Sequence, residues 1–147
     1  MLLLRGDYMG ADLYIKTISD EIDNKAGPRP NEELEFSKWM QVKDAMMDES
    51  GGYFRDSYNS SNLLNLIDFS YWSTPEELKW TISRNCLTVA SVRKLLNYWN
   101  ANKVKLELVI KCKQRADDRT YFINKAKEFD TFINKAVELK SSIKWSV

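Results

Sequence analysis

Residues 88–111 read TVASVRKLLNYWNANKVKLELVIK, and their apolar side chains recur every three or four positions. The stripe consists of Val92, Leu96, Trp99, Lys103, Leu106 and Ile110, widened by Leu95 and Val109. Because an α-helix has about 3.6 residues per turn, this spacing places the stripe on one helix face. Thr88 is suited to the N-cap position. The polar stretch Asn100-Ala101-Asn102 leaves open whether the segment forms one long helix or two collinear helices.

A second long stripe follows Asp117 and Asp118, either of which is suited to begin a helix. Its members are Phe122, Ala126, Phe129, Ile133, Ala136 and Lys140. Consecutive helices with long apolar faces bury those faces against each other. The C-terminal half of the chain therefore predicts an antiparallel helical pair.

A third helix is predicted over residues 32–48. Asn31 is a suitable N-cap, the glutamates after it favour the positive end of the helix dipole, and Gly51-Gly52 ends the pattern. Its apolar face is interrupted only at Lys43 and is made of Phe36, Trp39, Met40, Met46 and Met47. A stripe of methionine and aromatic side chains at helical spacing is typical of core, so we expect this face to be buried.

Two shorter helices are expected in the middle of the chain. Leu63, Leu64 and Ile67 predict the first of them. Residues 74–77, TPEE, combine an N-cap, a proline suited to the first helical position and a capping-box glutamate. They predict a helix over residues 75–83.

Two segments alternate apolar and polar residues with the period of a half-buried strand, namely residues 11–16 and 143–147. We expect them to pair, supported by the helices, because two strands alone are marginally stable. The predicted fold class is mainly α: an antiparallel helical bundle with a small two-stranded sheet formed by the N- and C-terminal segments. Residues 1–147 are expected to form a single domain, with residues 1–8 as an N-terminal extension.

The chain contains no histidine, which excludes Ser-His-Asp and Cys-His triads and zinc sites that need an imidazole. Cys86 and Cys112 are too few and too widely separated for a disulfide framework or a CxxC motif. The apolar run Leu2-Leu3-Leu4 stops at Arg5 and is shorter than the apolar region of about 7–15 residues in a signal peptide. We therefore expect a cytoplasmic protein with no metal and no cofactor.

Charge is divided unequally along the chain. Residues 1–73 carry 7 basic and 13 acidic side chains, and residues 74–147 carry 15 basic and 8 acidic ones. The halves have net charges of −6 and +7, which the overall value of +1 conceals. A basic half can contact nucleic acid, whereas two oppositely charged halves can also attract each other within one fold.

Residues 52–59, GYFRDSYN, form the densest cluster of chemically active side chains. Tyrosine and arginine are common anchors of binding surfaces, because they offer wide contact at low entropic cost. Asp12 and Tyr14, on the outer face of the first predicted strand, are the natural remote partners, and Asp12 is placed to take the Arg55 guanidinium in a bidentate pair. The predicted binding residues are Asp12, Tyr14, Tyr53, Arg55, Asp56, Tyr58 and Asn59.

Two other interpretations of this cluster stay open. It can be a structural loop in which Arg55 and Asp56 pair with neighbouring side chains or cap backbone groups, with Phe54 inserted into the core. Alternatively, Asp12 and Asp56 can form an acid/base or metal-binding carboxylate pair in an enzyme without histidine. No phosphate-binding glycine loop, dinucleotide fingerprint or nucleophile elbow is present in the sequence, so we assign no catalytic residue.

Nucleic-acid binding is a further alternative. Basic residues near Tyr98 and Trp99 can track phosphates while the aromatic rings stack on bases. The residues concerned are Lys103, Lys111, Lys113, Arg115 and Arg119. Lys103 and Lys105 project about 200° apart on a helix, however, so the run encircles the axis and favours a solvated surface.

Residues 9–15, MGADLYI, and residues 52–59, GYFRDSYN, resemble a family of small uncharacterised bacterial and phage proteins that share both motifs. Tyr71 stands where the family has a tryptophan, and the acidic, proline-rich stretch that follows is shortened. The resemblance implies a bacterial or phage setting and Met9 as the natural start, but no activity. Altogether the sequence predicts a small, helical, non-enzymatic accessory protein that binds a protein partner.

Overall fold

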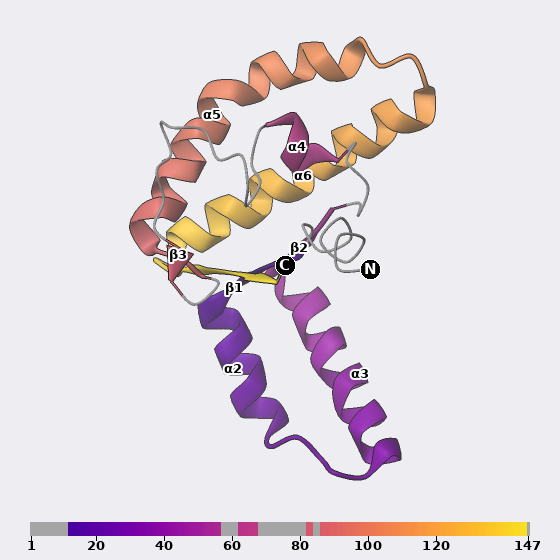
Figure 1. The fold of residues 1–147 in the computed structure, drawn as a ribbon, viewed down its shortest axis with the longest axis vertical. Coiled ribbons are helices and arrows are strands. Elements are labelled where there is room, and N and C mark those ends of the chain that lie inside the picture. The colour runs from indigo at the N-terminus through magenta and orange to yellow at the C-terminus, as the bar shows by residue number, and fades with distance from the viewer. Residues whose placement is uncertain (1–11, 57–61, 68–81, 84–85, 147) are drawn as a thin grey trace.

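The computed structural model describes residues 12–56, 62–67, 82–83 and 86–146 (Figure 1). Its elements are β1 (Asp12–Ile15), α2 (Lys16–Ala26), α3 (Glu33–Ser50), β2 (Tyr53–Arg55), α4 (Leu63–Leu66), β3 (Ile82–Ser83), β4 (Cys86–Leu87), α5 (Val89–Lys111), α6 (Ala116–Glu138) and β5 (Ile143–Ser146). The chain is therefore mainly α with a minor β component, which confirms the predicted fold class.

The strands of the described residues form one antiparallel sheet in the order β2-β1-β5-β4-β3. The predicted pairing of the two terminal segments is confirmed, with Leu13 opposite Trp145 and Ile15 opposite Ile143. The expectation of only two strands was wrong, because the sheet has five. The additional strands are two or three residues long, too short to display a period of two.

The two faces of the sheet differ in burial. Leu13 and Ile15 are fully buried, while Asp12 and Tyr14 alternate with them on the outer face. Phe54 of β2 points inward and packs against two rings of α6, with centroids 5.2 Å from Phe129 and 6.0 Å from Phe132. Helix α6 therefore lies against the inner face, and the outer face is the side on which polar side chains gather.

Helices α5 and α6 run in opposite directions along the body of the molecule, as predicted (Figure 1). Helix α5 is one continuous element, and the side chain of Thr88 caps it by accepting a hydrogen bond of 3.2 Å from the Ser91 amide. The rings of Trp99 and Phe129 meet edge to face at 5.0 Å, so they join the two predicted stripes in the core.

Helix α6 ends in a Schellman motif. Lys140 has a positive φ of 51°, its amide donates to the Val137 carbonyl, and the Ser141 amide donates to the Ala136 carbonyl. The predicted stripe placed Lys140 on the helix, whereas the helix ends at Glu138. This turn directs the chain into β5.

Helices α2 and α3 form a hairpin that projects away from the sheet (Figure 1). The predicted helix over 32–48 is confirmed by α3, but its expected burial was wrong, because no residue of α3 is buried. Trp39 packs at the hairpin instead, where its indole donates to the Gly27 carbonyl and Lys43 lies 4.3 Å above its ring. Of this stripe, Met46 and Met47 contact the core near the base of the hairpin.

The two short helices predicted for the middle of the chain differ in outcome. Helix α4 confirms the one beginning at Leu63. The helix predicted over residues 75–83 was wrong at its end, where Ile82 and Ser83 form a strand, and its other residues lie outside the described ones. In the described part of the chain, no helix has the length and apolarity that crossing a membrane requires.

Candidate functional site

Four of the predicted binding residues meet on the outer face of the sheet. Strand pairing sets Asp12 opposite Arg55 and Tyr14 opposite Tyr53. Side chains alternate along a strand, so all four project to the same side, away from the buried Leu13 and Phe54. We call Asp12, Tyr14, Tyr53 and Arg55 the outer-face patch.

The patch is internally ordered. The rings of Tyr14 and Tyr53 stack with centroids 5.0 Å apart and planes inclined by 28°. The Tyr53 hydroxyl donates a hydrogen bond of 2.7 Å to Oδ1 of Asp12. Nε of Arg55 lies 3.7 Å from the same oxygen, an ion pair longer than a hydrogen bond, so the expected bidentate geometry was wrong. Asp12 therefore joins β1 to two side chains of β2.

Both tyrosines are held in the neutral form. Burial raises the pKa of Tyr14, and the nearby charges of Asp12 and Asp44 raise it further. Burial also raises the pKa of Tyr53 well above its usual value, assisted by the hydrogen bond to Asp12. The patch thus offers two neutral rings in a negative field that Arg55 only partly offsets.

A hollow of about 340 Å³ opens beside the patch. Its lining consists of Asp12, Tyr14, Asp44, Met47, Asp48, Tyr53 and Arg55. Asp44, Met47 and Asp48 were not predicted as site residues. The signal for them was the short connection from α3 to β2, which forces the last turns of α3 to lie near the strand.

A second hollow of about 520 Å³ adjoins the first and shares Asp48, Tyr53 and Arg55 with it. It lies between β2 and α6. Two lysines of α6 bind backbone carbonyls at the two ends of residues 50–55. Lys125 donates to the Arg55 carbonyl, and Lys135 donates to the Ser50 carbonyl. The patch therefore sits between two concave surfaces.

Asp56 does not belong to the patch. It is only 3% exposed, and its carboxylate accepts hydrogen bonds from the Leu64 amide at 2.9 Å and from the Tyr121 hydroxyl. These partners belong to α4 and α6, whereas Asp12 contacts Tyr53 and Arg55 on the outer face. The structure does not bring Asp12 and Asp56 together as an acid/base pair. Tyr58 and Asn59 lie outside the described residues.

The predicted nucleic-acid residues are spread over α5, α6 and the connection between them. Lys103 pairs with Asp130 at 3.3 Å, and Arg119 donates to the Lys113 and Gln114 carbonyls at 2.6 and 3.0 Å. Nζ of Lys113 lies 5.4 Å from the centroid of the Phe122 ring. Lys111 and Arg115 are exposed. Three of the five residues therefore already contact groups of their own fold.

Comparison of the chain with models of known protein families, with curated proteins and with solved structures finds no match.

Proposed function

We propose that the protein is a non-enzymatic interaction protein that binds a protein partner through the outer-face patch. The observation that carries this proposal is the Tyr14–Tyr53 stack on the outer face, with Asp12 held beneath the Tyr53 hydroxyl. Two hollows adjoin this stack, which gives a partner concave surfaces on both sides of Arg55.

Preorganisation supports a binding role. Stacking and hydrogen bonding already restrict the rotamers of Tyr14 and Tyr53, so these two side chains lose little further entropy when a partner binds. Tyrosine and arginine are enriched among the residues that carry most of the binding energy of interfaces. Arg55 is exposed and remains in reach of a partner while it pairs with Asp12.

The charge of the hollow indicates the partner's chemistry. Asp12, Asp44 and Asp48 line it together with a single cation, Arg55. A lysine or arginine of the partner is therefore the side chain that fits best between these carboxylates and the tyrosine rings, because it gains both ion pairing and cation–π contact.

The cellular setting belongs to the same proposal. The resemblance of the MGADLYI and GYFRDSYN motifs supports a bacterial or phage setting, and the composition supports a cytoplasmic location. Nucleic-acid binding through the C-terminal helices is less favoured, because Lys103, Lys113 and Arg119 already contact groups within the fold.

The test is affinity capture from cells of the organism that encodes the protein, with the full chain as bait. Tyr14→Ala and Arg55→Ala are compared with Arg93→Ala, a matched control at an exposed arginine of α5 outside the patch. Each bait is first shown to unfold at the temperature of the unchanged protein. We expect one partner that the unchanged bait and the Arg93→Ala bait retain and the two patch variants lose.

The captured partner is then purified and its dissociation constant measured directly. Arg55→Ala should weaken binding about tenfold or more if Arg55 is an anchor of the interface. Equal binding by both patch variants would contradict the proposal. Two results together would support the nucleic-acid alternative instead of this proposal. The captured material would be lost after nuclease treatment, and the affinity of the protein for the released nucleic acid would fall steeply with salt.

A further inference from the structure

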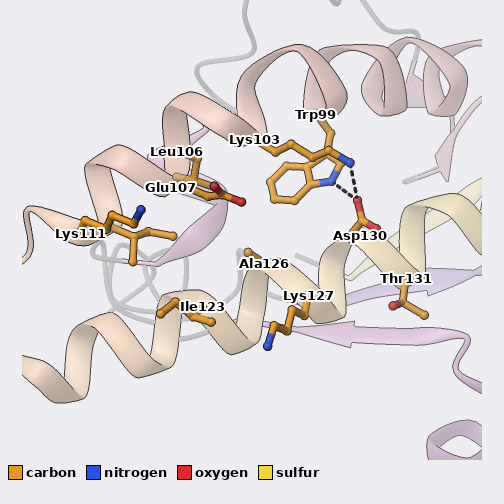
Figure 2. A pocket seen from close by; sticks show the side chains of 11 residues that line it. Trp99, Lys103, Leu106, Glu107, Lys111, Ile123, Ala126, Lys127, Asp130 and Thr131 are labelled. Atoms are coloured by element: carbon orange, nitrogen blue, oxygen red, sulfur yellow. Dashed lines mark hydrogen bonds and ion pairs between the residues drawn. The ribbon is translucent and has the colours of Figure 1, made fainter.

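A groove runs along the exposed side of the α5–α6 pair (Figure 2). It encloses about 540 Å³ and is lined by Trp99, Lys103, Leu106, Glu107, Ile110, Lys111, Ile123, Ala126, Lys127, Asp130 and Thr131. Its residues on α5 extend from Trp99 to Lys111, about 18 Å or three turns of helix. The α5 residues of the groove line neither hollow beside the outer-face patch, whereas Lys127 and Thr131 of α6 also line the second hollow.

The floor of the groove is apolar. Trp99, Leu106 and Ile110 are buried beneath it, and Ile123 on the α6 side is 45% exposed. An apolar floor with an exposed apolar side chain beside it provides apolar area that another molecule can cover.

The polar side chains of the groove fall into two groups. Asp130 is internally satisfied, since the Trp99 indole donates to it at 2.8 Å and Lys103 donates to it at 3.3 Å (Figure 2). Among the described residues, by contrast, Glu107 and Lys111 make no ion pair, although they lie one helical turn apart. Within the described part of the chain, the α5 edge of the groove therefore presents one unpaired negative and one unpaired positive charge, and the exposed Lys127 on the α6 edge adds a second positive charge.

We propose that this groove is the contact surface between two copies of the chain related by a twofold axis. In such a contact the same surface meets itself, so every residue needs a complement on that surface. An axis that crosses α5 midway between Glu107 and Lys111 sets each Glu107 opposite the Lys111 of the other copy. The apolar floor and Ile123 are then covered by the same association. A partner of single charge would satisfy only one of the two groups.

The experiment uses the full chain and measures its oligomeric state by sedimentation over a range of concentrations. We expect a reversible monomer–dimer equilibrium for the unchanged protein. Glu107→Lys and Lys111→Glu should each raise the dimer dissociation constant about tenfold or more, because each places two like-charged pairs across the axis. Both residues are exposed, and circular dichroism confirms that each variant keeps its helices.

Complementation makes the test specific. When Glu107→Lys and Lys111→Glu are mixed, one copy carries two positive residues and the other two negative ones, so a mixed dimer should form although neither variant dimerises alone. Lys105→Glu is the matched control, since Lys105 is exposed on α5 but does not line the groove. Its dimer should persist.

Three outcomes would overturn the proposal. The first is an unchanged protein that stays monomeric at every concentration, which would leave the groove to a different occupant. The second is a dimer that neither reversal weakens, which would place the interface elsewhere. The third is the failure of the two reversals to associate when mixed.

Discussion

The Tyr53 hydroxyl and the Asp12 carboxylate meet across the β1–β2 pair at 2.7 Å. Tyr53 is thereby held against the outer face of the sheet, stacked on Tyr14. Burial, the hydrogen bond and the negative charge of Asp12 all favour the neutral phenol, so the pKa of Tyr53 lies well above the usual value of 10.0.

This shift predicts how stability depends on alkaline pH. The unfolded chain ionises Tyr53 near its usual pKa while the folded chain does not, so the stabilisation is complete below about pH 10 and is lost as pH rises further. Asp12→Asn should lower the pKa of Tyr53 and make this loss shallower. Urea unfolding of both proteins between about pH 8 and pH 11.5 measures the difference, with Asp117→Asn as an exposed control. Identical pH profiles would contradict the assignment.

Asp56, which directly follows β2, is predicted to stabilise the fold through its hydrogen bonds to α4 and α6. Asp56→Ala leaves the Leu64 amide and the Tyr121 hydroxyl without this acceptor in a buried place, and we expect a loss of about 2–3 kcal/mol in the free energy of unfolding. Tyr121→Phe removes one of these bonds and should cost about 1 kcal/mol. Denaturant titration measures both, and Asp117→Ala serves as the exposed control. A loss below about 0.5 kcal/mol for Asp56→Ala would show that the carboxylate does not stabilise the fold.

Gly52 is predicted to be required for the approach of α2 to the sheet. A Cβ at this position would lie 2.7 Å from Cγ2 of Ile18, which is closer than two carbon atoms tolerate. Gly52→Ala should therefore destabilise the protein by about 1–3 kcal/mol. Combining it with Ile18→Ala relieves the overlap, so the double variant should lose less stability than the two single variants together. Strict additivity in urea unfolding would argue against the contact.

Lys140 is predicted to be a site where stability can be gained. Its φ of 51° lies in the left-handed region, which a side chain with a Cβ adopts at a cost that glycine avoids. Lys140→Gly should raise the free energy of unfolding by up to about 1 kcal/mol. Lys140→Ala retains the Cβ and should bring no gain. Thermal unfolding of the unchanged protein and the two variants measures the gain in stability. Equal gains from both substitutions would show that the lost charge, and not the backbone conformation, is the cause.

The long helices could be predicted because their patterns repeat over many turns. The stripe around Trp99 and the one around Phe129 each specify a buried face, and two such faces in succession have few alternatives to packing together. The same pattern misled for α3, because periodicity shows which face is apolar but not what lies against it. Trp39 finds its partners within the hairpin, at Gly27 and Lys43.

The candidate site could be predicted only in part. Alternation along the first strand placed Asp12 and Tyr14 on the outer face, and Arg55 was identified as the partner of Asp12. The separation of Asp56 from this group depends on strand β2, whose three residues are too few to show alternation. Asp44 and Asp48 line the hollow because the short connection from α3 to β2 keeps the last turns of α3 near the strand, a signal that lies in chain connectivity and not in side-chain periodicity.

The sheet pairs strands from opposite ends of the chain, which are synthesised at different times. The Thr17 amide and hydroxyl both donate to Oγ of Ser141, 124 residues further along the chain, and β5 lies between β1 and β4 in the sheet. At the usual rate of translation, β1 emerges from the ribosome roughly ten seconds before its neighbour β5 exists. During that interval the β1 edge that β5 will cover is unpaired, and an unpaired strand edge is prone to aggregate. The nascent chain therefore exposes a strand edge that the completed fold covers.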